Sequence, residues 1–402
     1  MSAVSDLVRD YPFRRGRRSE RKAGDIAQEL HATMPEAFFV EDLSPGRSAW
    51  VFRRNEDIRS ILFDTEHFSS ENLSQMSELV SADWRLIPLE VDPPAHGFYK
   101  ALLQPRFTPS RMTAFEEEIR RDARQHVADF AGSGKCDFIG DFAVPFPAKI
   151  FLRLMGLPAE MLGQFLTWEK QLISGESLEA VANSVRSVSG YLEEVFADRR
   201  QHPTDDLISY ALAKDVRGRT LGPGEMIGLG MTLYTGGLDT VASHLGHMVR
   251  HLAENPAEQN LLRSQPELIP DAVEEMMRAF ASVNITRLCC KPVSVRGIAL
   301  QPGDRVAINL SLAGRDPEAY DQPEVVRFDR RPQHLSFGAG THVCLGIHLA
   351  RRELRIALEE ILASLPEFRI APGARPETDL GSVFQLFTLP LVWSAGQQPA
   401  TT

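Results

Sequence analysis

The sequence predicts a mainly helical protein with a small β region. Between residues 115 and 130 apolar residues recur at the spacing of an amphipathic helix, at Ile119, Ala123, Val127 and Phe130. A longer helix is predicted from about residue 223, where a proline and an acid stand in the first turn, to about residue 255. From residue 284 to residue 312 the pattern changes to short strands separated by glycine-containing turns.

The remaining elements follow in chain order. Trp50-Val51-Phe52 predicts a short strand, and a helix follows through Ile58 to Phe63. A proline-punctuated loop from residue 84 leads into a helix that carries His96 and Lys100 on one face. Residues 141–158 are interpreted as scaffold, and further helices are predicted over residues 159–215 and 270–278. Of these segments only residues 270–278 carry a candidate functional motif.

Length and composition indicate one large globular domain over residues 1–402. No linker rich in Pro, Gly or Ser divides the chain, and 43% hydrophobic with 24% charged residues is ordinary for a protein with a sizeable core. The charged residues 1–24 are expected to form a flexible N-terminal tail. The net charge of −10 argues against a nucleic-acid partner.

Cysteine usage and the N-terminus indicate a soluble cytoplasmic protein, which we expect to be a monomer. Four cysteines suit a reducing compartment rather than a disulfide scaffold: Cys136, Cys289, Cys290 and Cys344. No apolar run near the N-terminus has the length of a signal peptide or a membrane span. Cys289 and Cys290 are adjacent in a predicted strand, so their side chains should point to opposite faces.

Cys344 lies between a glycine-broken loop and an amphipathic helix, in the segment HLSFGAGTHVCLGIHLARREL of residues 334–354. Unpaired N–H groups of a first helical turn stabilise a thiolate, and a thiolate is a metal ligand. No second Cys or His stands at zinc-like spacing, so a cofactor that supplies its own equatorial ligands, such as haem, fits better. The alternative is a buried structural cysteine, which is the commoner role of a lone cysteine.

The long helix contains an unusual turn. Gly236 and Gly237 each cost roughly 1 kcal/mol relative to Ala in a helix interior, and Asp239-Thr240 follows in an otherwise apolar turn. Missing side chains let a flat ligand approach, and a Thr hydroxyl that bonds back to a carbonyl can open the helix for a small molecule. The alternative is a simple kink with Asp239 facing solvent.

Three motifs together resemble the cytochrome P450 family, in the family's order, within residues 25–395. Residues 337–346, FGAGTHVCLG, resemble its haem-binding signature, GGLDT of residues 236–240 its oxygen-binding groove, and Glu275-x-x-Arg278 its ExxR pair. The resemblance implies the mainly α cytochrome P450 fold, with haem b between the long central helix and the cysteine loop. It also implies that Cys344 is the axial iron ligand, whose electron donation favours O–O cleavage.

The resemblance implies roles for further residues. Asp239 and Thr240 become the proton-delivery pair, and Arg327 is expected to join Glu275 and Arg278 in a structural network. Lys100 stands where relatives have an arginine, so the charge is kept but the bidentate fork is lost. The implied cofactor-binding residues are His96, Lys100, Gly236, Arg287, His334, Phe337, Gly338, His342, Cys344 and Gly346.

The implied reaction is insertion of one oxygen atom of O2 into an unactivated C–H bond of a small apolar substrate. Similarity to the camphor-hydroxylase group favours a terpenoid or norisoprenoid, although Trp84 replaces a Tyr whose hydroxyl holds camphor in that group. The implied pocket residues are Trp84, Leu86, Leu233, Thr235, Val283 and Val383. No flavin or nicotinamide fingerprint is present, so electrons are expected from a [2Fe-2S] ferredoxin with its reductase, docked near Lys100, Arg106 and Arg111.

Two other functions use the same cofactor. A non-catalytic haem-thiolate sensor needs the cysteine but neither Asp239 nor Thr240. A peroxygenase or isomerase of the same fold typically has an altered proton relay. The presence of both relay residues favours the monooxygenase.

Overall fold

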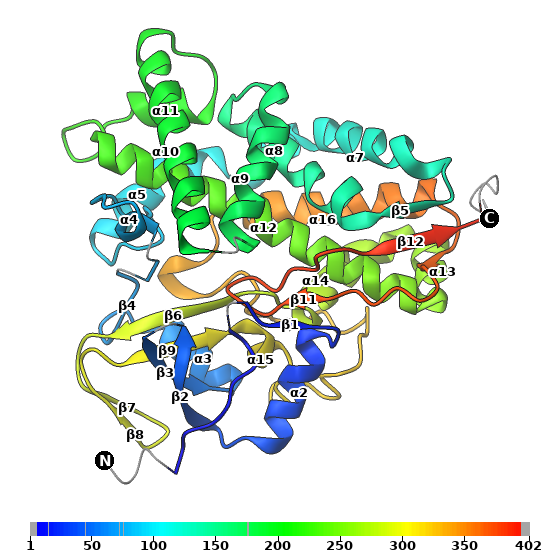
Figure 1. The fold of residues 1–402 in the computed structure, drawn as a ribbon, viewed down its shortest axis with the longest axis horizontal. Coiled ribbons are helices and arrows are strands. Elements are labelled where there is room, and N and C mark those ends of the chain that lie inside the picture. The colour runs from blue at the N-terminus through cyan, green and yellow to red at the C-terminus, as the bar shows by residue number, and fades with distance from the viewer. Residues whose placement is uncertain are drawn as a thin grey trace. The chain divides into compact units, whose positions relative to one another are not determined.

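The computed structural model describes residues 6–14, 16–44, 46–71, 73–74, 76–174 and 177–394. The chain groups into two compact units (Figure 1). One contains residues 1–69, 117–143 and 240–402, and the other contains residues 70–116 and 144–239. The expectation of one undivided domain over residues 1–402 stays a prediction.

The first unit contains a five-stranded sheet, in the order β2-β3-β9-β6-β4 (Figure 1). The strands are β2 Ala37–Ser44, β3 Arg47–Phe52, β4 Phe68–Ser69, β6 Asn284–Cys289 and β9 Arg305–Asn309. β3 runs parallel to β9, and β6 pairs antiparallel with β9, with Arg287 opposite Val306. Helices α2 Ala23–Thr33, α3 Asn55–Phe63 and α15 Leu310–Gly314 pack together in the same unit. Both the predicted strand at Trp50–Phe52 and the helix after it are confirmed.

Three small sheets complete the β structure of this unit. They pair β10 Phe368–Ile370 and β5 Lys135–Asp137 with β12 Pro390–Trp393, β7 Val293–Val295 with β8 Ile298–Leu300, and β1 Arg18–Ser19 with β11 Thr378–Asp379. Cys289 is buried and Cys290 is exposed, as predicted for neighbours in a strand.

The N-terminal segment differs from the predicted flexible tail over residues 6–14 and 16–24. Tyr11 and Phe13 are fully buried, and the Tyr11 hydroxyl accepts a hydrogen bond from Asn309 Nδ2 at 2.8 Å. β1 pairs with β11, so strand hydrogen bonds also hold this segment. The high charge of the segment predicted an exposed tail, so the burial of Tyr11 and Phe13 was not predicted.

The helices follow the predicted periodicity closely. The first unit also holds α7 Glu116–Ala131, α13 Pro256–Ser264, α14 Ile269–Ala279 and α16 Ile347–Ser364. The second unit holds α4 Met76–Leu79, α5 Ala95–Leu103, α6 Pro109–Ala114, α8 Pro145–Met155, α9 Leu162–Ser174, α10 Leu178–Gln201 and α11 Leu207–Ala213. Among the described helices none is long and apolar enough to cross a membrane.

The long helix α12, Pro223–Glu254, contributes to both units and confirms the predicted central helix. Its 32 residues span about 48 Å at 1.5 Å per residue. Gly228 shows why its first half needs small residues, because a Cβ there would lie 1.8 Å from the Arg85 carbonyl oxygen. The segment at Arg85 can therefore pack on α12 only where a side chain is missing.

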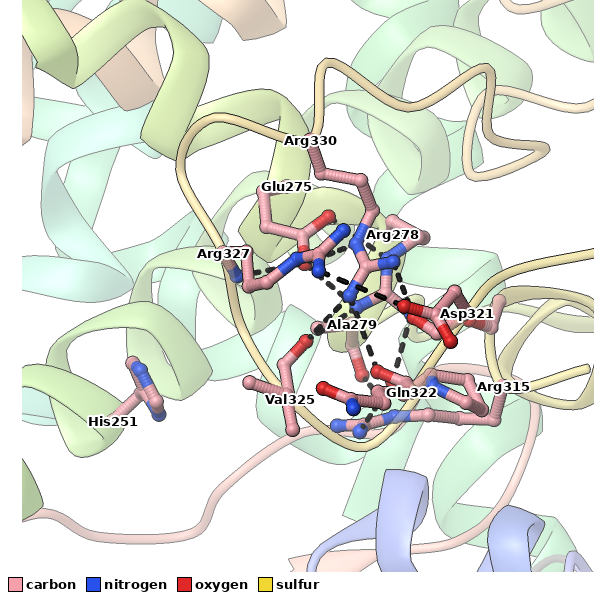
Figure 2. Close-up of polar contacts among 12 residues, drawn as sticks. His251, Glu275, Arg278, Ala279, Arg315, Asp321, Gln322, Val325, Arg327 and Arg330 are labelled. Carbon is pink, nitrogen blue, oxygen red and sulfur yellow. Dashed lines mark hydrogen bonds and ion pairs between the residues drawn. The ribbon is translucent and has the colours of Figure 1, made fainter. Parts of the chain in front are cut away.

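A buried ion network ties α14 to the chain after it (Figure 2). Glu275 and Arg278 are both fully buried and form two hydrogen bonds of 2.8 Å, from Arg278 Nε and Nη2 to the two Glu275 oxygens. The Arg278 guanidinium also donates to the carbonyls of Gly314, Pro323 and Val325. These bonds fix the backbone that follows α15, because each carbonyl is held by a buried cation.

The prediction that Arg327 joins this network is correct for its backbone but wrong for its side chain. Its backbone N–H donates to Glu275 Oε1 at 3.0 Å, but its side chain pairs with Asp321 at 3.7 Å. The side chain that joins the network is Arg330, whose Nε donates to Glu275 Oε1 at 2.9 Å (Figure 2). Burial alone raises the pKa of Glu275, but the hydrogen bonds from these groups hold the pKa below its ordinary value.

We predict that Glu275→Gln destabilises the folded protein by about 3–5 kcal/mol, because it leaves Arg278 and Arg330 buried without a counter-charge. Denaturant unfolding of the haem-loaded protein at neutral pH measures this. The matched control is Asp271→Asn on the same helix, whose partner Arg331 is 77% exposed, and which should change stability by about 0–1 kcal/mol. Equal effects of the two substitutions would contradict the account.

The same pair predicts a pH dependence. Because the pKa of Glu275 is lowered on folding, its contribution is complete above the ordinary glutamate pKa of about 4.3 and is lost as the pH falls through the folded pKa. Glu275→Gln should therefore flatten the acid limb of a stability-against-pH curve relative to Asp271→Asn.

Candidate functional site

The cysteine loop, residues 337–346, turns tightly before α16 begins at Ile347. The Cys344 N–H donates to the Phe337 carbonyl at 2.9 Å, and the Val343 N–H donates to Gly340 at 3.2 Å. Gly346 caps α16, and its carbonyl accepts from Ala350 at 2.9 Å. Cys344 lies two residues before the cap, near the start of α16 as the sequence predicted, and it is exposed.

Two glycines give the loop its shape. Gly338 and Gly340 have φ of +69° and +66°, a region that residues with a Cβ rarely adopt. A Cβ at Gly340 would also lie 2.7 Å from the Leu62 carbonyl oxygen at the end of α3. The close approach of the loop to α3 therefore requires glycine.

A second charged cluster supports the loop from α14. Glu274 accepts from Arg351 Nε at 2.7 Å and Nη2 at 2.6 Å, and from His334 Nε2 at 3.3 Å. Burial raises the pKa of Glu274, but its His334 and Arg351 partners hold it at about 2. The Arg351 guanidinium also lies 4.9 Å from the centroid of the Phe337 ring. α14, the cysteine loop and α16 are thereby joined around one carboxylate.

His334 therefore has partners within the protein at both ring nitrogens. Its Nδ1 accepts the Ser336 N–H at 3.2 Å, so Nε2 carries the hydrogen donated to Glu274. Contact of His334 with the cofactor stays a prediction, but these contacts assign the ring to holding the loop. Arg287 lies buried on β6 and His342 lies in the short helix Gly340–His342.

His96 and Lys100 both lie on α5, four residues apart, as predicted. His96 is buried, and burial together with the positive charge of Lys100 lowers its pKa, against the opposing charge of Asp92. A neutral histidine beside a lysine provides hydrogen-bond donors and one positive charge, which suits a carboxylate ligand.

The two glycines in the unusual turn of α12, Gly236 and Gly237, lie in different environments. Gly236 is exposed and has no atom near the position of an added Cβ, whereas a Cβ on Gly237 would lie 3.0 Å from the Phe151 ring. Only Gly236 thus leaves open space. Gly237 allows α8 to pack closely on α12.

Asp239 is buried, so the alternative that it faces solvent is wrong. Its Oδ1 is enclosed and has no hydrogen-bond partner, and burial raises its pKa to about 6. A carboxyl with this pKa can both hold and release a proton near neutral pH. Thr240 follows it, half-buried.

Sequence reasoning missed two side chains beside this turn. His244 donates from Nδ1 to the Thr240 carbonyl at 2.7 Å, and burial lowers its pKa to about 4, so it is neutral. Glu169 on α9 is buried, and burial, together with the charge of Asp239, raises its pKa well above the ordinary value. The spacing of His244 four residues after Thr240 was a usable signal. No pattern in the sequence pointed to Glu169, which is 70 residues from Asp239.

The predicted pocket residues fall into two groups. Trp84 and Leu86 are buried in the segment that precedes α5, and Leu233 and Thr235 are half-buried on α12, all within the second unit. In the first unit Val283 and Val383 lie opposite each other in an isolated β-bridge. The Thr235 hydroxyl donates to the Met231 carbonyl at 3.0 Å, so its methyl group is free to face an apolar ligand.

The donor set at Cys344 fits haem. Among the described residues no group of three His, Cys, Asp or Glu side chains could hold a metal ion. Cys344 is exposed, lies beside the start of a helix and belongs to a loop that contains glycines. One cysteine ligand suits a metal whose other ligands come from a flat ring, as in haem. A Cβ at Gly346 would lie 3.9 Å from the Cys344 sulfur, so glycine keeps this side of the sulfur clear.

Comparison with known proteins agrees with this fit. Residues 161–390 match the cytochrome P450 family model. The chain is 37% identical over 368 residues to the probable cytochrome P450 127A1 of Sinorhizobium fredii, covering 91% of this chain and 88% of that protein. It is 29% identical to the mycinamicin IV hydroxylase/epoxidase of Micromonospora griseorubida, covering 91% and 94% of the two chains.

Solved structures give the same result. The crystal structure of cytochrome P450 CYP101C1 matches with a TM-score of 0.87 at 30% identity, over 97% of this chain and 98% of that chain. The crystal structure of CYP101J2 matches with a TM-score of 0.86 at 29% identity and the same coverage. The predicted mainly α fold with a small β region is thereby confirmed. The chain belongs to the cytochrome P450 family, and its cofactor is the haem b that members of this family bind.

Proposed function

We propose that this protein is a monooxygenase that inserts one oxygen atom of O2 into a C–H bond of a small apolar substrate. The observation that carries the proposal is the buried, unsatisfied Asp239 carboxyl directly before Thr240, in the turn where Gly236 leaves open space. A protein that only binds a gas has no need of a buried carboxyl with a pKa of about 6.

The bound haem supplies the iron at which O2 is reduced. The residues of the chain supply the ligand, the enclosure and the protons. The Cys344 sulfur would hold the iron, and the hydrogen bond of the Cys344 N–H to the Phe337 carbonyl, with the Gly346 cap, holds the backbone at Cys344. His96, Lys100 and Arg287 provide positive charge and donors for the propionates, while Phe337, Gly338, His342 and Gly346 form the loop on the sulfur side.

Asp239 and Thr240 deliver protons. With a pKa of about 6, Asp239 Oδ1 takes a proton and passes it to the Thr240 hydroxyl, which presents it to the oxygen site. The ring of His244 holds the Thr240 carbonyl at 2.7 Å and so fixes the backbone that orients this hydroxyl. Positioned proton transfer of this kind contributes about 10²–10⁴-fold to a rate.

The substrate we propose is a terpenoid or norisoprenoid. The residues that we propose to contact it are Trp84, Leu86, Leu233, Thr235, Val283 and Val383. These side chains are buried or half-buried and mostly apolar, which suits a small ligand with few polar groups. The names of two relatives refer to other compounds, mycinamicin IV and nocardicin C. The indole N–H of Trp84 and the hydroxyl of Thr235 are the polar groups among the six.

The electron donor we propose is a [2Fe-2S] ferredoxin with its reductase, acting on a cytoplasmic monomer. Arg111 and Lys100 offer positive charge for an acidic partner. Arg106, also expected in this surface, pairs with Asp205 at 3.4 Å and lies 4.4 Å from the Tyr210 ring centroid. Its charge is partly neutralised, so Arg111 should matter more than Arg106 for docking.

We predict that Thr240→Ala keeps substrate affinity and NADH consumption but diverts much of the flux to hydrogen peroxide. Without the Thr240 hydroxyl to position them, protons reach the wrong oxygen atom and hydrogen peroxide is released. Asp239→Asn should instead slow turnover by about 10²-fold, because the amide cannot transfer a proton. The measurement is product formed per NADH oxidised with ferredoxin and reductase present.

Thr232→Ala is the matched control for this pair, because its hydroxyl bonds back to the Gly228 carbonyl on the same helix. It should stay coupled. If Thr240→Ala is also fully coupled and Asp239→Asn turns over normally, protons enter by another route and the assignment of both residues is wrong.

We predict that camphor binds more weakly than ionones or cineole. The Trp84 N–H sits elsewhere, on a larger ring, than a tyrosine hydroxyl does, so it cannot hold the camphor ketone in the same place. Titration of the ferric protein, followed by the spectral change on substrate binding, ranks the compounds. Trp84→Tyr should raise the affinity for camphor relative to cineole, and tight camphor binding by the unchanged protein would contradict the prediction.

A further inference from the structure

Two side chains of α12 converge on one backbone oxygen in the first unit. The Ser243 hydroxyl donates to the Phe384 carbonyl at 2.6 Å, and His247 donates to the same carbonyl from Nε2 at 2.7 Å. Ser243 is 1% exposed and His247 is 6% exposed. A carbonyl oxygen has two lone pairs, so these two donors satisfy it completely and hold it from two directions.

The Phe384 carbonyl belongs to the residue directly after Val383, which is one of the proposed substrate contacts. Val383 lies opposite Val283 in an antiparallel β-bridge, so their side chains share one face. Beside this bridge the Phe384 N–H donates to the Ser282 carbonyl at 2.7 Å. We refer to Val283 and Val383 together as the valine wall. Its position follows from that of the Phe384 peptide groups.

Phe384 and Val383 point to opposite sides of the extended backbone. Phe384 is fully buried, and its ring stacks on Phe13 with the centroids 4.8 Å apart. Val283 and Val383 are only half-buried. The packed core therefore lies on the Phe384 side, and the wall keeps apolar surface that a small apolar ligand could cover.

α12 also carries the hydroxyl that we propose to deliver protons. Thr240, Ser243 and His247 stand at positions i, i+3 and i+7, which lie on one face of a helix. α12 is continuous over this stretch, so Ser243 and His247 lie about 4.5 and 10.5 Å along its axis from Thr240. One rigid element thus holds both the Thr240 hydroxyl and the two donors that locate the wall.

We propose that Ser243 and His247 are positioning residues that set the distance between the valine wall and the oxygen site, and so decide which C–H bond of the substrate is oxidised. This inference rests on the proposed function, because it takes the wall as a substrate contact and Thr240 as the proton donor. Both residues act through the Phe384 carbonyl. A terpenoid offers several C–H bonds, and a displacement of about 1 Å is enough to change which of them reacts.

The test uses two probes that bind the ferric iron of the holoprotein through a nitrogen atom, imidazole and phenylimidazole. Imidazole carries no group that reaches the wall, whereas the phenyl group of phenylimidazole extends into an apolar pocket. The change in haem absorption gives both dissociation constants. Their ratio therefore reports on the wall without any turnover.

Either donor alone still holds the carbonyl, so Ser243→Ala and His247→Leu should each weaken phenylimidazole relative to imidazole by less than about 3-fold. The double variant leaves the buried carbonyl without a side-chain donor. It should weaken phenylimidazole by at least about 10-fold, more than the product of the two single effects. General structural damage would weaken both probes equally. A double effect no larger than the product would overturn the proposal.

His251 provides a matched control on the same helix. It is 8% exposed, and its Nε2 donates to Glu258 of α13 at 2.7 Å instead of to the strand of the wall. His251→Leu should leave the probe ratio unchanged. Conversely, Ser243→Ala combined with His247→Gln keeps one N–H donor and should restore the ratio of Ser243→Ala alone.

Oxidation of cineole provides the second readout. With ferredoxin and reductase present, the double variant should give a different ratio of hydroxylated isomers, while product formed per NADH stays unchanged because Thr240 is intact. If the double variant does not take up haem, the single variants decide. Ser243→Ala must then change the isomer ratio more than His251→Leu does, and equal ratios would overturn the proposal.

Val383→Ala separates this proposal from the proposed function. It should weaken phenylimidazole relative to imidazole, and no effect would mean that the wall does not line the pocket, which overturns the proposal. If the protein oxidises no substrate but the probe ratio responds as stated, the wall is positioned by Ser243 and His247 and the proposed function fails. If turnover is coupled and the double variant keeps both ratios, the function stands and the role of these two residues is wrong.

Discussion

The interaction on which the rest of the structure depends is the buried contact between α14 and the chain that leads to the cysteine loop. Glu275 and Arg278 are fully enclosed, and Arg330 and the Arg327 N–H complete the hydrogen bonds of the carboxylate (Figure 2). The preceding residue of α14, Glu274, holds His334 and Arg351. Ions so deeply buried contribute little net stability, but they allow only one arrangement of the backbone. That arrangement presents the Cys344 sulfur before α16.

A second constraint acts on α12. Small residues let neighbouring segments approach its backbone, at Gly228 under Arg85 and at Gly237 against Phe151, while Gly236 leaves open space. Asp239 follows in the same stretch and is buried without a cation, in contrast to the heavily paired acids of α14. The chain therefore treats its buried carboxyls in two ways. Paired acids hold the backbone, and unpaired acids are left with pKa values at which protons can move.

Sequence reasoning found what is encoded locally. The cysteine loop, the glycine-broken turn and the ExxR pair are short motifs that can be identified from neighbouring residues alone. Local sequence patterns also located α7, α12 and α14. It failed where contacts join distant segments. Arg330 rather than Arg327 reaches Glu275, because the loop's path and not its composition decides which side chain points inward. Glu169 stands 70 positions before Asp239, yet burial and the charge of Asp239 together raise its pKa. Tyr11 and Phe13 are buried in a segment whose high charge predicted a flexible tail.

The central claim is that Cys344 supplies a thiolate to haem iron, and the carbon monoxide difference spectrum of the reduced protein tests it most directly. The account predicts the strongly red-shifted band of a thiolate-ligated haem, its loss in Cys344→Ala, and its retention in Cys290→Ser, which alters an exposed cysteine elsewhere. A histidine-type spectrum in the folded protein, or a red-shifted band that survives Cys344→Ala, would contradict it.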